Sequence, residues 1–347
     1  MRKDRSRLAV LPVAFAALAL ASCNAGSGLG ASHVATLPPT GFAERGRPAV
    51  SCTVAPSSAI EDGVDSPQAI LFDGDGDLYV PNFLGNNVTV YAAGSHKLLR
   101  TISEQVTHPT AIALDGLGEL YVANSDSTIS LFKKQGAQYV RSIDQGVHSP
   151  QVLAFDGQGN LYVAHFFPDG ISVYAPGAGT PLRTIKKGIR QPFAMAFDAF
   201  DRLYVANHDA NTVTVYGFGT TTPDRTISNS ITRPTAIAID GFNDLYVANS
   251  TDDSVTVYGL HDTEPRRELF RGVFRPTSLA IDSFDNLYVG NSKPGEGSVS
   301  VYKPKSGRPI QTLCPGITLP NALSFDPHGS LYVSNSNAKK ISIFAPL

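Results

Sequence analysis

The chain contains no tryptophan, and only 17% of its 347 residues are charged. Its formal net charge of −2 leaves no excess of positive charge of the kind that binds nucleic acid. It also lacks a phosphate-binding loop, a Ser-His-Asp grouping, a cysteine nucleophile and a His-x-x-x-His metal pair. Because tyrosine and phenylalanine supply the aromatic residues, beside 31 glycines and 24 prolines, the composition indicates a soluble, mostly β protein.

The amino terminus has the pattern of a secretory signal peptide. A basic start at residues 1–7 precedes an apolar run at residues 8–21 that is too short for a membrane span. The run ends in Leu20-Ala21-Ser22-Cys23, which resembles the lipobox of bacterial lipoproteins. That resemblance implies cleavage before Cys23, acylation of its thiol and a lipid anchor in the bacterial cell envelope, with Asn24 favouring the outer membrane. The alternative is an ordinary signal peptide that is cut nearby.

We therefore divide the chain into a signal peptide at 1–22, a flexible tether at 23–48 and one domain at 49–347. The tether is rich in glycine, serine, alanine and proline and shows little periodicity. Without the signal peptide, 24 Lys+Arg (28 minus 4) stand against 29 Asp+Glu (30 minus 1), a net charge near −5. We expect a monomer that meets the membrane through Cys23.

Two further cysteines, Cys52 and Cys314, lie at opposite ends of the domain. A leftover pair in a secreted compartment favours a disulfide, which would close most of the domain into one loop. The alternative is two separately buried thiols.

The domain repeats one motif seven times, written Leu245-Tyr-Val-Ala-Asn-Ser250 in one unit. The spacing of 41 to 44 residues is typical of a repeat architecture. The tyrosines of the motif are Tyr79, Tyr121, Tyr162, Tyr204, Tyr246, Tyr288 and Tyr332.

Each unit contains short apolar or alternating runs that are bounded by Gly, Pro, Asn or Asp, which predicts four antiparallel strands. Such a sheet cannot bury both faces alone, so we predict an all-β fold, a seven-bladed β-propeller. The last unit ends without a fourth strand. The interval from Ser58-Ala59-Ile60 to Pro67 matches that between other fourth strands and the next proline, so this amino-terminal segment should complete the last blade.

An aspartate closes the first strand of every unit, as Asp240 does before Gly241. An aspartate at this point accepts backbone N–H groups of its own turn, and we favour that role over a metal site. The seven are Asp73, Asp115, Asp156, Asp198, Asp240, Asp282 and Asp326.

The motif Asp-x-x-Gly-x-Leu-Tyr-Val-Ala-Asn at 115–124 and the run Thr-Val-Thr-Val-Tyr at 212–216 resemble the NHL and YVTN propeller families. The resemblance covers about residues 57–347. It implies the propeller fold but little about function, because such propellers include sensors, scaffolds and enzymes.

The residues that end the second strands should surround one mouth of the channel. One hypothesis is that they bind a polar ligand or a cation, with His165 as the chemically distinct member; the other is that each forms an Asx-turn in its own loop. Phe83, Phe166 and His208 follow three of them. The ring comprises Asn82, Asn124, His165, Asn207, Asn249, Asn291 and Asn335.

Arg190, Arg233 and Arg275 lie just before the prolines that open units 4, 5 and 6. They could form a basic arc for a carboxylate or phosphate group, or they could be solvated surface residues.

We favour a non-catalytic envelope protein that binds a protein, peptide or glycan at this mouth, with no cofactor and no metal ligand assigned. The regularity of the units supports this hypothesis, since an enzyme usually breaks several repeats to place its catalytic groups. The alternative is a metal-dependent enzyme that resembles the gluconolactonase or virginiamycin B lyase propellers, with His165 and His208 at the mouth.

Overall fold

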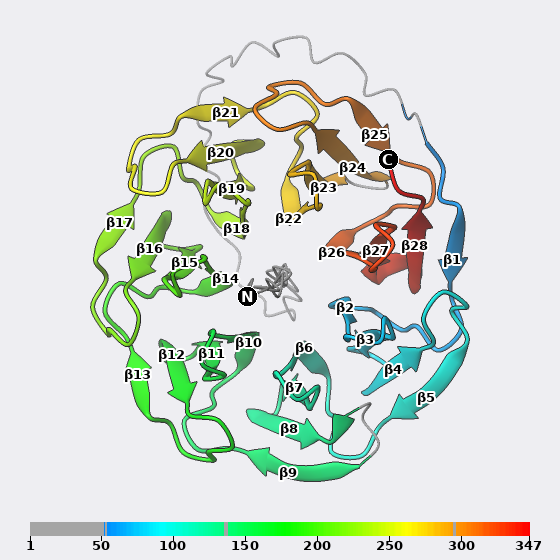
Figure 1. The fold of residues 1–347 in the computed structure, drawn as a ribbon, viewed down its shortest axis with the longest axis vertical. Coiled ribbons are helices and arrows are strands. Elements are labelled where there is room, and N and C mark those ends of the chain that lie inside the picture. Colours follow the sequence, from blue (N-terminus) through cyan, green and yellow to red (C-terminus); the bar gives the residue numbers. More distant parts are fainter. Residues whose placement is uncertain (1–51, 53, 135–137, 294–295) are drawn as a thin grey trace, which may run out of the picture.

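A computed structural model describes residue 52 and residues 54–134, 138–293 and 296–347. The signal peptide, the lipid-anchor residue Cys23 and the tether lie outside these residues. The described chain forms seven four-stranded antiparallel sheets, or blades, arranged as a ring (Figure 1). The predicted β-propeller is therefore confirmed.

In blades 1 to 6 the strands follow chain order from the channel to the rim, because every turn joins neighbours. Blade 1 contains β2 (Leu71–Phe72), β3 (Leu78–Asn82), β4 (Asn87–Tyr91) and β5 (Leu98–Ile102). Blade 2 contains β6 (Pro109–Leu114), β7 (Leu120–Asn124), β8 (Thr128–Phe132) and β9 (Tyr139–Ile143). Blade 3 contains β10 (Pro150–Phe155), β11 (Leu161–Phe166), β12 (Asp169–Tyr174) and β13 (Arg183–Ile185). Blade 4 contains β14 (Pro192–Phe197), β15 (Leu203–Asn207), β16 (Thr212–Tyr216) and β17 (Arg225–Ile227).

The remaining blades follow the same plan. Blade 5 contains β18 (Pro234–Ile239), β19 (Leu245–Asn249), β20 (Ser254–Tyr258) and β21 (Arg267–Leu269). Blade 6 contains β22 (Pro276–Ile281), β23 (Leu287–Lys293), β24 (Glu296–Tyr302) and β25 (Gln311–Leu313). Blade 7 contains β26 (Pro320–Phe325), β27 (Leu331–Asn335) and β28 (Lys340–Phe344), and a 3₁₀ turn at Ser336–Ala338 links the last two.

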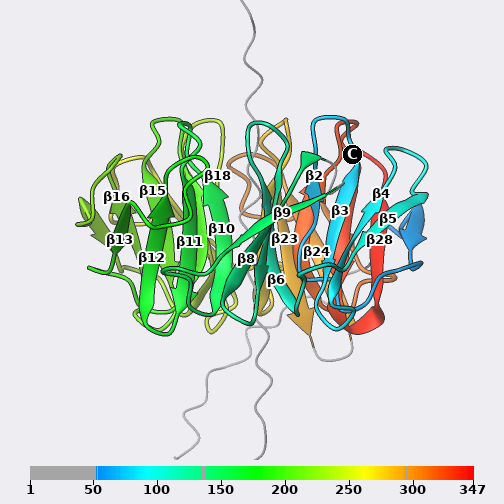
Figure 2. The ribbon, with the colours of Figure 1, turned by 90° about the horizontal axis from the view of Figure 1, so that it is seen from below.

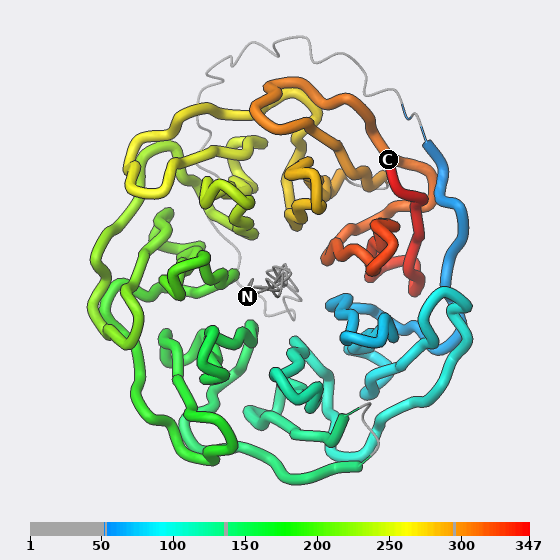
Figure 3. Tube along the Cα trace, in the orientation of Figure 1, coloured from blue at the N-terminus to red at the C-terminus, as the bar shows by residue number. Residues whose placement is uncertain are grey.

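The amino-terminal strand β1 (Ser58–Ile60) completes blade 7, as predicted. It pairs antiparallel with β28, with Ser58 opposite Ile343 and Ile60 opposite Ile341, and Figure 3 shows the two ends of the described chain side by side. The predicted disulfide is also present, since Cys52 and Cys314 are bonded with their Cα atoms 5.3 Å apart. The two links hold the amino-terminal segment to neighbouring blades: β1 pairs with β28 of blade 7, and Cys52 is bonded to Cys314, which follows β25 of blade 6.

The hydrophobic core lies between neighbouring blades. Residues of β19 and β20 in blade 5 cluster with Leu279, Leu287 and Val289 of blade 6, and equivalent clusters recur around the ring. No helix in the described part of the chain is long and apolar enough to cross a membrane.

The ring is a flat disc with loops on two sides (Figure 2). We call one side the entry face; it carries the loops that precede the first strand and follow the second strand of each blade. We call the other side the turn face; it carries the hairpins between the first and second strands, such as Asp240–Asp244, and the loops between the third and fourth strands. The two faces have different chemistry.

Candidate functional site

The asparagines that end the second strands are buried inside the blades. Their side chains are 0–2% exposed. In blade 5, Asn249 Oδ1 accepts the backbone N–H of Thr232 at 3.1 Å, and its Nδ2 donates to the hydroxyls of Ser254 and Thr256 at 3.2 Å each. Blades 1, 2, 4, 6 and 7 repeat the bond from Oδ1 to the residue 17 positions earlier.

Each asparagine is thus a latch that ties the entering loop to the second and third strands. The Asx-turn hypothesis placed the bond of each asparagine in the loop that follows the second strand. In the structure, the asparagine Oδ1 instead accepts an N–H group of the loop that precedes the first strand. The amides are saturated by protein groups, so a ligand on the entry face would meet their neighbours rather than the amides themselves.

His165 replaces the latch in blade 3. Its imidazole is 2% exposed; Nδ1 donates to the Pro168 carbonyl at 2.6 Å, and Nε2 lies 3.3 Å from the Ser172 hydroxyl oxygen. The ring of His148 packs edge-on against it with centroids 5.5 Å apart. Burial lowers the pKa of His165 below its usual value of 6.5. The histidine is therefore a neutral, internal group.

Gly170 makes room for this histidine. It lies opposite His165 in the β11–β12 pairing, where blade 5 has Ser254 opposite Asn249. A Cβ at residue 170 would lie 2.9 Å from His165 Cε1, which is closer than real contacts allow. The two departures from the repeat therefore form one coupled unit.

A continuous row of aromatic rings crosses the entry face from blade 3 to blade 4. Phe167 packs edge-on against Phe166, Phe166 stacks on Phe193 with centroids 5.3 Å apart, and Phe193 stacks on His208 with centroids 4.2 Å apart and an interplanar angle of 15°. Phe167 is 71% exposed, whereas Phe193 and His208 are 7% exposed. We call Phe166, Phe167, Phe193 and His208 the aromatic row.

Phe193 was missed by the sequence analysis. It follows Pro192 at a register shift in the β14–β15 pairing, a bulge position where blade 5 has Thr235. The Thr235 hydroxyl donates to the Pro276 carbonyl of the next blade at 2.8 Å, a bond that phenylalanine cannot make. Comparing this position among the units would have identified Phe193.

His208 joins the aromatic row to Arg233. The histidine Nδ1 lies 3.2 Å from Asp209 Oδ1, and its Nε2 accepts the Arg233 Nε–H at 3.3 Å. Burial lowers the pKa of His208, so the neutral Nδ1–H tautomer satisfies both contacts. The exposed guanidinium of Arg233 thereby lies at the end of the row.

The three predicted arginines are exposed on the entry face, but they are not equivalent. Arg233 and Arg275 directly precede their prolines, whereas Gln191 has that place in blade 4 and Arg190 lies one residue earlier. Arg190 Nε is 3.8 Å from Asp169 Oδ2, at the blade 3 side of the row. Arg190 and Arg233 therefore flank the aromatic row, and Arg275 lies one blade beyond it.

Blade 1 carries a smaller aromatic contact on the same face. Phe83 packs against His108 of blade 2 with ring centroids 5.0 Å apart, and Leu84 beside it is 57% exposed. This pair is not linked by any ring contact to the aromatic row among the described residues.

The aspartates that close the first strands cap their own hairpins on the turn face. Asp240 Oδ1 accepts the backbone N–H groups of Phe242 and Asp244 at 2.9 Å each, and Oδ2 accepts the Tyr246 hydroxyl at 3.1 Å. The predicted structural role is confirmed for this turn. Within the described residues, no three His, Cys, Asp or Glu side chains lie close enough together to hold a metal ion.

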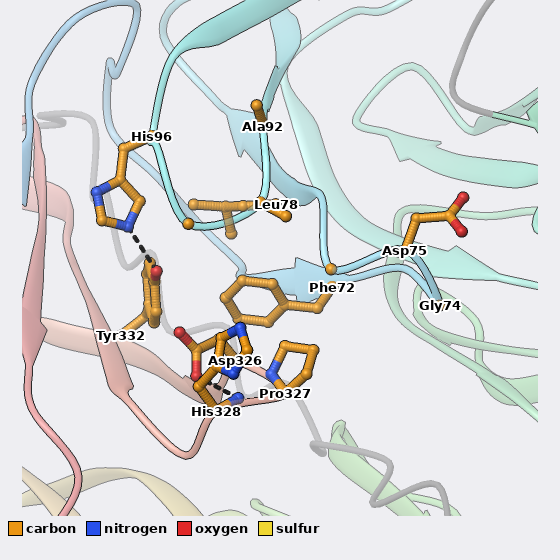
Figure 4. Close-up of a pocket in the computed structure, with 13 residues that line it drawn as sticks. Phe72, Gly74, Asp75, Leu78, Ala92, His96, Asp326, Pro327, His328 and Tyr332 are labelled. Atoms are coloured by element: carbon orange, nitrogen blue, oxygen red, sulfur yellow. Dashed lines mark hydrogen bonds between the residues drawn. The ribbon is translucent and has the colours of Figure 1, made fainter.

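A small cavity of about 220 Å³ opens on the turn face, where blade 7 meets blade 1 (Figure 4). Phe72, Leu78 and Pro327 supply its apolar wall, and His96 Nε2 lies 2.7 Å from the Tyr332 hydroxyl at its edge. Its volume lies below the roughly 300–1,000 Å³ of typical small-molecule pockets, so the cavity is not the candidate functional site.

The chain matches no known protein-family model and no curated protein. In three dimensions it is similar to a chain in the crystal structure of a mitotic checkpoint complex, with a TM-score of 0.74 over 92% of this chain and 98% of that chain. Sequence identity is 13%, so the likeness shows the fold alone. The seven sheets of the structure and this likeness together support the β-propeller fold and its repeat architecture.

Proposed function

We propose that the protein is an envelope lipoprotein of the NHL/YVTN type, held by acylated Cys23, whose propeller binds a protein or peptide segment on the entry face. The aromatic row carries this proposal. It is the place where two neighbouring blades depart from the repeat, blade 3 through His165 with Gly170 and Phe166 with Phe167, and blade 4 through Phe193.

The chemistry of the row favours a peptide over a glycan. A broad sugar-stacking platform would need several open aromatic faces, but Phe166, Phe193 and His208 stack on one another, so Phe167 is the one largely exposed ring of the row. What remains available is the exposed ring of Phe167, the ring edges and the guanidinium groups of Arg190 and Arg233. An apolar side chain next to a carboxylate fits this arrangement.

Panning of a random peptide library against the full-length protein tests the proposal. Selected peptides should contain an acidic residue near an aromatic or aliphatic one, and their affinity should fall at least tenfold in Phe167→Ser and in Arg233→Ala. Val140→Ser is the matched control, because Val140 is 39% exposed in the outer strand β9. Peptides that bind all four proteins equally, or a library that yields no binder, would contradict binding at the row.

The alternative function, a metal-dependent lactonase or lyase at the same mouth, finds no support in the site. His165 and His208 are both buried and both hydrogen-bonded to protein atoms.

A further inference from the structure

Three phenylalanines project from the turn face at the same turn position of consecutive blades. Phe200, Phe242 and Phe284 lie two residues after the capping aspartates of blades 4, 5 and 6, and they are 63%, 65% and 77% exposed. We call them the phenylalanine arc. Blades 1, 3 and 7 have Asp75, Gln158 and His328 at this position, and blade 2 has Leu117, which is 78% exposed. The aromatic residues thus belong to three consecutive blades, while one further exposed apolar side chain lies in blade 2.

The turns that carry the arc are fixed to one another. Asp201 of blade 4 accepts the Gly157 N–H of blade 3 at 2.9 Å, and Asp285 of blade 6 accepts the Gly241 N–H of blade 5 at 3.0 Å. Asn243 of blade 5 accepts the Ala199 N–H of blade 4 at 3.3 Å. Hydrogen bonds of backbone N–H groups therefore join the turns of blades 3 to 6, including the three that carry the arc.

The same clasp cannot form at the seam of blades 7 and 1. The donor position there is Pro327, which has no N–H, and the acceptor position is Gly76, which has no side chain. The acceptor side chains of the clasp, Asp201, Asn243 and Asp285, thus lie in the blades that carry the phenylalanines.

Cations accompany the arc. Lys305 Nζ lies 5.9 Å from the centre of the Phe242 ring. The Arg202 guanidinium lies 5.3 Å from the centre of the Phe200 ring, but its charge is neutralised by the ion pair with Asp198 at 2.5 Å. Lys303 and Arg308 are exposed in the same loop of blade 6 as Lys305, and residues 303–310 contain no acidic residue.

The carboxylates near the arc are engaged in ion pairs or hydrogen bonds with protein groups. Asp244 and Asp262 both pair with Arg266, at 2.9 and 2.6 Å, while Asp201 and Asp285 accept the clasp bonds. Lys303, Lys305 and Arg308 form no ion pair among the described residues, so unpaired positive charge lies beside Phe242 in this loop of blade 6.

We propose that the phenylalanine arc docks the propeller on an anionic lipid surface. Isolated aromatic tips insert between headgroups, and neighbouring lysine and arginine side chains meet the lipid phosphates. The occupant is a bilayer surface and not a groove-binding partner, because the rings protrude from separate turns. This assigns a membrane contact to the domain itself, beyond the proposed anchor at Cys23, and it leaves the entry face turned away from the bilayer.

The absence of tryptophan from the chain supplies a clean test. Full-length protein carrying Cys23→Ser, to remove the lipid anchor, receives one tryptophan, either Phe284→Trp on the turn face or Leu84→Trp on the entry face. With vesicles of phosphatidylglycerol and phosphatidylcholine, the emission at residue 284 should shift to shorter wavelength and be quenched by lipids brominated in their acyl chains. The emission at residue 84, which is 57% exposed in the native protein, should do neither.

Two companion measurements separate the contributions of the rings and the charges. Phe200→Ser with Phe242→Ser in the Phe284→Trp chain should abolish the quenching, and Lys303→Glu with Lys305→Glu should weaken vesicle binding at least tenfold. Added salt should weaken it in the same direction.

Equal quenching at residues 84 and 284, or no response at residue 284 with folded protein, would overturn the proposal. A blue shift that appears without vesicles and grows with protein concentration would also overturn it, because a second copy of the chain would then cover the arc. None of these outcomes bears on peptide binding at the entry face, which is measured on other variants.

Discussion

Replacing Asn249 with alanine should destabilise the propeller by about 2–4 kcal/mol, although the residue is not exposed to any ligand. The change leaves the buried N–H of Thr232 without the acceptor that lies 3.1 Å away, which costs about 1–3 kcal/mol. It also removes the bonds to Ser254 and Thr256, each worth about 0.5–1.5 kcal/mol and partly recovered if the hydroxyls rotate.

Urea unfolding followed by circular dichroism measures this loss as a lower midpoint with an unchanged slope. Ser250→Ala is the matched control, because Ser250 is the next residue and its hydroxyl bond to the Arg233 carbonyl is exposed. A loss below about 0.5 kcal/mol for Asn249→Ala, within the range of an ordinary surface substitution, would refute the latch.

Three further predictions follow from blade 3 and the seam. Burial lowers the pKa of His165, so below its usual value of 6.5 the unfolded state binds more protons and stability falls as pH falls. The urea midpoint of His165→Asn should therefore depend less on pH than that of the native protein between about pH 6.5 and 4.5. An unchanged pH dependence would contradict a buried neutral imidazole. Gly170→Ala should destabilise the protein by about 1–3 kcal/mol, because the new Cβ would lie 2.9 Å from the imidazole, and by clearly less in the His165→Asn background; additive losses would mean that the two positions are independent. Cys52→Ser with Cys314→Ser opens a loop of 262 residues and should cost a few kcal/mol, up to ~5 kcal/mol on a chain-entropy model, so a reductant should lower the melting temperature of the native protein but not of the double variant.

The fold was predictable because the sequence contains seven repeats of one unit. The Leu-Tyr-Val runs and the turn residues specify strands locally, and a four-stranded blade must stack to bury its faces. The interval between Ile60 and Pro67 even gave the closing strand, since sequence spacing is directly comparable within a repeat.

The candidate site was only partly predictable, since it depends on contacts between blades. The sequence shows that His165 departs from the motif, but only the structure shows that Gly170 accompanies it and that the imidazole faces the protein interior. Comparing the units identifies Phe193 as a departure from the polar residues at this position, but only the structure shows the bulge that directs its side chain. Its stacking between Phe166 of one blade and His208 of its own blade is a tertiary property.

The most direct test of ligand binding at the aromatic row is hydrogen–deuterium exchange of the full-length protein with and without a selected peptide. We predict slower exchange in the loops at residues 165–170, 189–193 and 207–211, and in the loop that carries Arg233. Protection in other blades only, or no protection at a saturating peptide concentration, would contradict binding at the entry face.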